Sequence, residues 1–121
     1  MPNNEVTSGI VDLLSTILEG LEHIRNRLRE GHLADTMYLF EDITRAFYSI
    51  NNSLEPIISE LPENQLLSLT DQLINIMEDM TTAYKQDDIE KSKADMQFLL
   101  LPGFKKWKIE LERCLNIYNA S

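Results

Sequence analysis

The sequence of 121 residues predicts an all-α fold, an antiparallel up-down-up-down four-helix bundle built from two helical hairpins. Four segments repeat apolar residues at steps of three and four, which is the period of an amphipathic helix. Two of the connections, Gly31-His32 and residues 86–88, are so short that the next helix has to run back along the previous one. With 43% apolar and 26% charged residues, the composition is that of one globular domain, residues 1–121.

The first hairpin is expected at residues 8–55. Residues 1–7 are predicted to be a lead-in, with Thr7 or Ser8 as the helix N-cap. Gly31 is expected to end the first helix, because glycine readily takes the left-handed conformation found after helix C-termini. Arginines crowd the last turns of this helix, where they complement the helix dipole or, as an alternative, form an anion site: Arg25, Arg27 and Arg29. The predicted core face is Ile10, Leu14, Ile17, Leu21, Ile24 and Leu28.

The second helix is expected from residue 33 to residue 54. Proline disfavours helical backbone at the residue before it, so Pro56 and Pro62 predict a connection at residues 55–63, with a short helical turn at residues 57–60. The predicted core face is Leu33, Met37, Phe40, Ile43, Phe47, Ile50 and Leu54.

The second hairpin is expected at residues 64–118, with an aspartate at the turn capping its second helix. Pro102 lacks an N–H and its ring clashes with the carbonyl of Phe98, which predicts a kink or a break in the last helix. Gly103 allows a neighbouring element to approach closely. The predicted core of the third helix is Leu66, Leu69, Leu73, Ile76, Met77, Met80 and Tyr84. That of the fourth is Ile89, Met96, Leu100, Gly103, Trp107, Leu111, Cys114 and Tyr118.

The two hairpins share one pattern. A shift of 56 residues superposes apolar positions of the first hairpin on those of the second, and after Pro102 the shift becomes 57. A duplicated hairpin explains the match, and so does the common pattern of amphipathic helices. The pairs include Leu21 with Met77, Ile24 with Met80, Leu28 with Tyr84, Phe47 with Phe104 and Leu54 with Leu111.

The last helix carries the run Ala94-Asp95, Leu99-Leu100, Pro102 and Trp107. This run resembles the last helix of a family of small, uncharacterised bacterial helical-bundle proteins, with the pattern A-D-x-x-x-L-L-x-P-x-x-x-x-W. More loosely, the chain as a whole is similar to the flagellar export chaperones, which are short, acidic, antiparallel bundles. Both resemblances imply a helical bundle.

The net charge of the chain limits the kinds of molecule that it is expected to bind. A net charge of −9 argues against binding to nucleic acid and to an anionic membrane surface, since both need a basic protein face. No apolar run approaches the roughly 20 residues that span a bilayer. A single cysteine and an N-terminus without a signal-peptide pattern favour the cytoplasm. The basic tail, with Lys105, Lys106 and Lys108, is expected to attract an acidic partner or to pair with acids of the chain itself.

The sequence does not favour an enzyme, and it predicts no cofactor, no metal and no small-molecule substrate. Dinuclear metal sites in helical bundles need several glutamates and two histidines that point into the core. This chain has two histidines in all, and neither is on a predicted core face, since His23 lies off the core face of its helix and His32 lies in a turn. Glu19 and His23 are four residues apart and are expected to form a surface pair. Cys114 falls on the core face and is interpreted as a small buried hydrophobe.

The predicted functional feature is a docking surface on the last helix. Phe98, Leu101, Lys105 and Ile109 are expected to form an apolar strip with a lysine rim. As an alternative, the kink at Pro102 rotates Phe98 or Ile109 back into the core. The strip suits a chaperone or adaptor that binds an amphipathic helix of a protein partner, or a self-associating structural homodimer.

Overall fold

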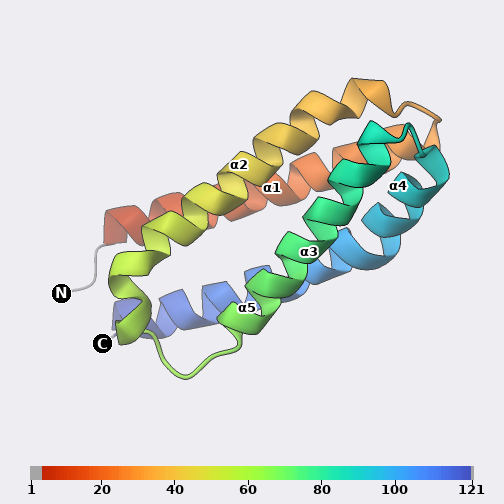
Figure 1. Ribbon diagram of the computed structural model, residues 1–121. Coiled ribbons are helices and arrows are strands. Elements are labelled where there is room, and N and C mark those ends of the chain that lie inside the picture. Colours follow the sequence, from red (N-terminus) through yellow and green to blue (C-terminus); the bar gives the residue numbers. More distant parts are fainter. Residues whose placement is uncertain (1–3, 121) are drawn as a thin grey trace.

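The computed structural model describes residues 4–120, and within that range the chain is helical and contains no strand (Figure 1). The all-α prediction is therefore confirmed. The long helices are α1 (Asn4–Arg29), α2 (Met37–Leu54), α3 (Leu66–Lys85) and α5 (Leu101–Ala120). The shorter elements are the 3-10 helices η1 (Ala34–Thr36) and η2 (Glu55–Glu60), the helix α4 (Ile89–Asp95) and the π-helix η3 (Met96–Leu100).

The helices form two contacting pairs. α1 packs along α2, and α3 packs on α4 and α5, while α1 also contacts α4 and α5 and so joins the two pairs. The start of α1 and the end of α5 lie at the same end of the molecule (Figure 1). Between α2 and the second pair the contacts include stacked aromatic rings: the ring centroids are 5.1 Å apart in Phe40 and Tyr84 and 4.8 Å apart in Phe47 and Trp107.

The start of α1 differs from the prediction. Helix already begins at Asn4, so the expected N-caps Thr7 and Ser8 lie inside it, and residues 1–3 of the expected lead-in lie outside the described residues. Thr7 is buried and exchanges hydrogen bonds of 3.1–3.3 Å with Asn119 near the end of α5. Packing against the C-terminal turns of α5 thus extends α1 beyond the residue where local capping preference would begin it.

Both tight turns use the same hydrogen-bonding pattern, a Schellman motif. After α1, the amide of Gly31 donates to the carbonyl of Leu28 and the amide of His32 donates to that of Arg27. After α3, Asp87 donates to Tyr84 and Asp88 to Ala83 in the same way. The residue in the left-handed conformation is Gly31 (φ 88°) in the first turn, as predicted, and Asp87 (φ 54°) in the second. The side chain of Asp88 then caps α4 by accepting from the amide of Lys91, which confirms the predicted aspartate cap.

Replacing Asp87 with glycine is expected to stabilise the protein by about 0.5–1 kcal/mol, because Asp87 is the residue other than glycine that the described chain holds at positive φ. The melting temperature should rise by roughly 2–6 °C. Gly31→Ala is the matched control, and it should lower the stability because alanine tolerates positive φ poorly. A lower melting temperature for Asp87→Gly would show that the aspartate side chain contributes more than its backbone costs.

The connection between the two pairs is more helical than expected, since η2 covers residues 55–60, and it ends later, since α3 begins at residue 66. Glu55 is helical (φ −51°, ψ −46°) and opens η2 although Pro56 follows, so the prediction of non-helical backbone at that residue is wrong. Proline tolerates the first turn of a helix, where no amide donor is needed. Leu61, before Pro62, is extended as predicted (ψ 152°). α3 begins at Leu66 rather than at residue 64, and its first amide donates to the side chain of Asn64 at 2.9 Å.

The predicted core faces are largely confirmed. All six predicted core residues of α1 are buried, as are Phe47, Phe104 and Trp107 at the centre of the molecule. The indole N–H of Trp107 donates to the hydroxyl of Thr70 at 3.0 Å, so this large side chain is both packed and hydrogen-bonded. A few predicted core residues are only half-buried and pack against the core from its edge: Met37, Leu69, Ile76 and Ile89.

A kink or a break was predicted at Pro102, and the structure shows a bend through a π-helix without a break (Figure 1). η3 spans Met96–Leu100, and the amide of Leu101 donates to the carbonyl of Met96, five residues back, so the chain stays helical from α4 into α5. The ribbon bends through this segment (Figure 1). A π-turn inserts one residue into an α-helix. Gly103 lets α3 approach, as predicted, since a Cβ atom at this position would lie 3.2 Å from a methyl group of Leu73.

The inserted residue explains the change in the internal repeat. The shift of 56 still relates buried Phe40 to buried Met96, and the shift of 57 relates buried Ile43 to buried Leu100. The extra residue therefore falls inside η3. Gly31 and Asp87, the two positions of positive φ among residues 4–120, are also related by the shift of 56. The two helix pairs match in burial and in turn structure, and their origin by duplication stays a prediction.

Candidate functional site

The outer face of η3 and α5 carries two large exposed apolar side chains. Phe98 is 70% exposed and Ile109 is 68% exposed, so neither is rotated into the core. Leu101 was predicted to join them on the surface, and this prediction is wrong because its side chain is only 4% exposed. It lies three residues before buried Phe104, and residues at this spacing share one face of a helix.

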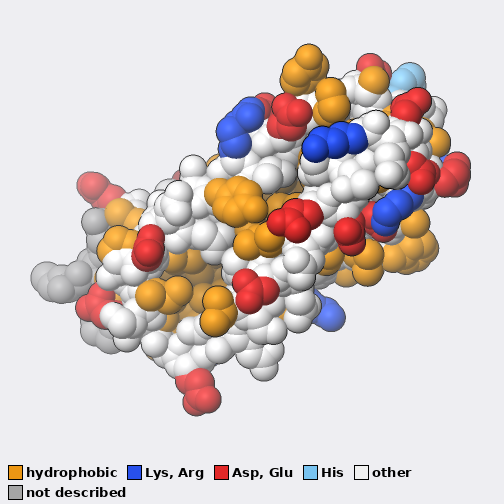
Figure 2. Space-filling model, viewed as in Figure 1, with side chains coloured by type: hydrophobic (Ala, Val, Ile, Leu, Met, Phe, Trp, Pro, Cys, Tyr) orange, Lys and Arg blue, Asp and Glu red, His pale blue; other side chains and the backbone are white. Residues whose placement is uncertain are grey.

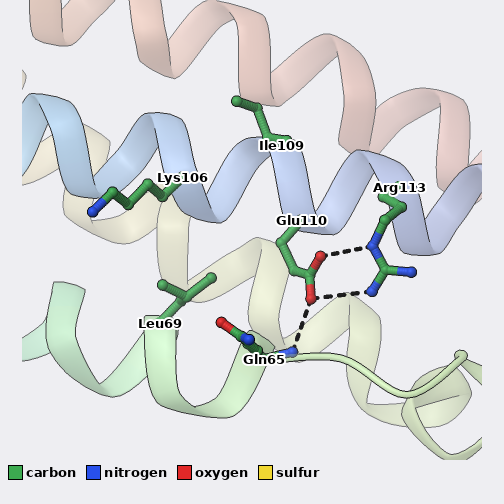
Figure 3. A pocket seen from close by; sticks show the side chains of 6 residues that line it. All are labelled: Gln65, Leu69, Lys106, Ile109, Glu110 and Arg113. Carbon is green, nitrogen blue, oxygen red and sulfur yellow. Dashed lines mark hydrogen bonds and ion pairs between the residues drawn. The ribbon is translucent and has the colours of Figure 1, made fainter.

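Two adjoining hollows separate this face from α3. The larger, of about 460 Å³, is lined by residues of α5 and of the start of α3: Gln65, Leu69, Lys106, Ile109, Glu110 and Arg113 (Figure 3). The smaller, of about 180 Å³, lies between α3 and the π-helix and is lined by Leu69, Gln72, Leu73, Ile76, Phe98, Leu99, Pro102, Gly103 and Lys106. Leu69 and Lys106 line both hollows and so mark their junction. We call the two hollows and the exposed residues that border them the α3–α5 groove.

The polar end of the groove is held rigidly. The carboxylate of Glu110 accepts from the backbone amide of Gln65 at 2.9 Å and from the guanidinium of Arg113 at 2.8 and 3.1 Å (Figure 3). The hydrogen bonds from Arg113 and from Gln65 lower the pKa of Glu110. Arg113 also donates to the carbonyl of Glu63 at 3.0 Å. These contacts tie the chain before α3 to α5 and fix one end of the groove.

Apart from Gln72 and Lys106, the rest of the groove is lined by apolar residues. Figure 3 shows Leu69 pointing from α3 toward α5, and Ile109 of α5 lines the same hollow. At the opposite end, Leu99 is 45% exposed beside Phe98. Apolar side chains gather on the surface where the chain passes from α4 into α5 (Figure 2). Exposed apolar side chains beside a hollow are the usual composition of a protein-binding surface.

Two lysines accompany the apolar residues. Lys105 and Lys106 are exposed, and neither makes an ion pair with the described residues. Lys108, the third lysine of the predicted basic tail, pairs with Glu112 at 2.9 Å. Lys105 was predicted to border the strip, and it lies one helical turn before Ile109, but the lysine that lines both hollows is Lys106. Lys106 was expected only as part of the basic tail, and its spacing of four from Pro102 is the signal that places it on the outer face.

The histidines, Glu19 and Cys114 do not come together in a site. Glu19 and His23 are both exposed on α1. His32 lies 3.3 Å from Asp35 at the first turn. Cys114 is fully buried, and its burial raises the pKa of the thiol, while the neighbouring Arg113 lowers it by a smaller amount. Among residues 4–120, no group of three or more His, Cys, Asp or Glu side chains is placed to hold a metal ion.

The arginines at the end of α1 serve the first turn. Arg27 pairs with Glu30 and with Asp35, both at 3.0 Å. Arg29 donates to the side chain of Gln97 at 3.4 Å and so connects α1 to the π-helix. The ion pairs of Arg27 hold the first turn, and the predicted complement of the helix dipole by the three arginines stays a prediction.

Comparisons with known proteins complete the description of the site. None of the described helices combines the length and the apolarity needed to cross a membrane. No curated protein and no solved structure matches the chain. Residues 5–110 match the family described as a domain of unknown function, DUF8042, and this range includes α1 to α4, the π-helix and the first half of α5. The chain therefore belongs to the DUF8042 family, and the α3–α5 groove, apart from Arg113, lies within the part that defines it.

Proposed function

We propose that this protein is a non-catalytic protein-binding module, a chaperone or adaptor that holds an amphipathic helix of a partner in the α3–α5 groove. The observation that carries the proposal is the exposure of Phe98 and Ile109, at 70% and 68%, at the borders of two adjoining hollows. Large apolar side chains beside a groove are what the apolar face of a helix packs against. The working compartment we propose is the cytoplasm, where a single reduced cysteine is the normal state.

The scaffold that we propose for this groove is an antiparallel up-down-up-down four-helix bundle, in which α4, η3 and α5 together make the fourth helix. The two Schellman turns support it, because the chain reverses within the four residues 30–33 after α1 and the three residues 86–88 after α3. The position of the start of α1 and the end of α5 at one end of the molecule supports it as well (Figure 1). A bundle holds α3 and α5 at a fixed distance, so the groove between them is largely preformed.

The alternative is a self-associating homodimer that buries the same residues, and one experiment separates the two functions. In the double variant Phe98→Ser with Ile109→Ser, the melting temperature should stay within a few degrees of the wild type, since surface substitutions usually change the stability by less than about 0.5 kcal/mol. Partner capture from the native cytoplasm, quantified by mass spectrometry, should fall by about tenfold or more.

The matched control removes two equally exposed apolar side chains outside the groove, with Tyr38→Ser and Leu67→Ser, whose residues are 74% and 77% exposed. This control should capture partners like the wild type. If sedimentation shows a dimer at low micromolar concentration that only the Phe98/Ile109 variant loses, the homodimer replaces the adaptor. Equal capture by all three proteins would rule out the groove as a binding surface.

A further inference from the structure

The charge around the α3–α5 groove differs from that of the rest of the protein. The chain has 20 acidic and 11 basic residues, and six of its basic side chains pair with acids of the same chain: Arg27, Arg45, Lys91, Lys93, Lys108 and Arg113. Five basic side chains have no such partner within residues 4–120: Arg25, Arg29 and Lys85 away from the two hollows, and Lys105 and Lys106 beside them. Two neighbouring exposed lysines thus lie between the apolar residues Phe98 and Ile109 without an acid to neutralise them.

The position of these lysines argues against a second copy of the chain as the occupant. In a twofold-symmetric dimer the same surface patch is buried on both subunits. If the strips from Phe98 to Ile109 faced each other, the lysines at their middle would meet the lysines of the other copy. Like charges placed opposite each other in an interface oppose association. The same lysines attract a partner with carboxylates at the corresponding positions.

The spacing of the apolar residues defines the partner further. Phe98 and Ile109 are separated by 11 residues of continuous helix, which corresponds to about 16 Å at 1.5 Å per residue. A partner helix that lies along the groove meets both of them with apolar residues about three turns apart, near positions i and i+11. The residues between these two positions then face Lys105 and Lys106.

We propose, on the basis of the function proposed above, that the occupant is an acidic amphipathic helix of another protein, with apolar residues three turns apart and Asp or Glu between them. The apolar residues supply the contact with Phe98, Ile109 and the two hollows. The carboxylates pair with Lys105 and Lys106 and select this helix over basic or neutral amphipathic helices.

The test uses two synthetic helical peptides of about 18 residues, long enough to cover the groove. Both carry the same leucines at i, i+4, i+7 and i+11, and the positions beside them are glutamate in one peptide and lysine in the other. Fluorescence anisotropy with the full chain should give at least about tenfold tighter binding of the glutamate peptide at low salt. The difference should shrink at about 0.5 M salt, because exposed charges are then screened.

Charge reversal at the lysines assigns the effect to the groove. Lys105→Glu with Lys106→Glu should remove the preference for the glutamate peptide. The control, Lys85→Glu with Arg45→Glu, changes the net charge by the same amount at exposed positions outside the groove and should keep the preference; the exposed ion pair that Arg45 loses with Asp42 contributes little to stability. Equal effects of the two double variants would mean that the net charge of the protein selects the peptide, which contradicts the proposal.

The two proposals fail in different ways. If both peptides bind equally well and Phe98→Ser with Ile109→Ser abolishes both, the groove is a binding site without the acidic preference, and only the present proposal is overturned. If neither peptide binds at about 1 mM, a concentration that detects even weak helix docking, an acidic helix is not the occupant. A dimer that depends on Phe98 and Ile109 would make a second copy the occupant and overturn both proposals.

Discussion

Replacing Trp107 with alanine is expected to lower the free energy of unfolding by about 3–5 kcal/mol, the usual cost of removing a fully buried aromatic side chain. The indole is 0% exposed and lies where the two helix pairs meet, against Phe47 of α2 and Phe104 of α5. Its loss leaves a cavity between helices that are far apart in the sequence. The hydroxyl of Thr70 also loses the donor of its 3.0 Å hydrogen bond. Because domains are stable by only about 5–15 kcal/mol, this variant should melt at a much lower temperature.

Two milder variants separate the contribution of the ring from that of the hydrogen bond in this loss of stability. Trp107→Phe keeps a ring in the core and removes the hydrogen bond, and Thr70→Val removes only the acceptor, so each should cost clearly less than the alanine variant. Urea unfolding followed by circular dichroism measures all three. Trp107 is the only tryptophan, and its emission in the native protein should be that of an apolar environment. A cost below about 1 kcal/mol for Trp107→Ala would show that the two helix pairs hold together without this residue.

Deleting Lys105 is expected to abolish the cooperative unfolding transition. The deletion turns every later residue of α5 by about 100° relative to α4, because one residue of an α-helix corresponds to that rotation. In the wild-type protein the buried face of α5 includes Trp107, Leu111 and Tyr118. After the deletion these side chains would point to the edge of the core or to solvent. Thermal unfolding followed by circular dichroism should lose its sharp midpoint.

Deleting Gln97 together with Pro102→Ala is the matched control, because both deletions remove one exposed residue from the same helical segment. Without Gln97 the buried residues from Ser92 onward follow alternating steps of four and three, as they do in α1, so the π-turn is no longer needed. Alanine removes the clash that proline would cause in a plain α-helix. This variant should keep a cooperative transition. Loss of the transition in both deletion variants would show that the π-helix is required for folding and is more than an accommodated extra residue.

The docking surface was only partly predictable from the sequence. Phe98 and Ile109 lie far from the Leu100 face on a helical wheel, and the wheel was right that both are exposed, although Phe98 lies inside the π-helix and only Ile109 lies in a regular α-helix. It was wrong for Leu101, which is at the end of the π-turn and beside Phe104. The hollows themselves depend on how closely α3 approaches α5 at Gly103, and helical periodicity carries no information on that distance.

The sequence by itself determined which residues face the core and where the chain turns. The period of α1 and α2, the glycine at residue 31 and the aspartate cap at residue 88 each depend on interactions within a few residues, so local preference was sufficient. Only the tertiary structure decided the start of α1, where Thr7 packs on the end of α5, and the conformation of residues 96–100. Ser92, Met96, Leu100 and Phe104 follow each other at steps of four, and a plain α-helix would gradually turn such a row away from the core. Burial of all four against the other helices outweighs the weaker hydrogen bonding of a π-turn, and this balance exists only in the packed protein.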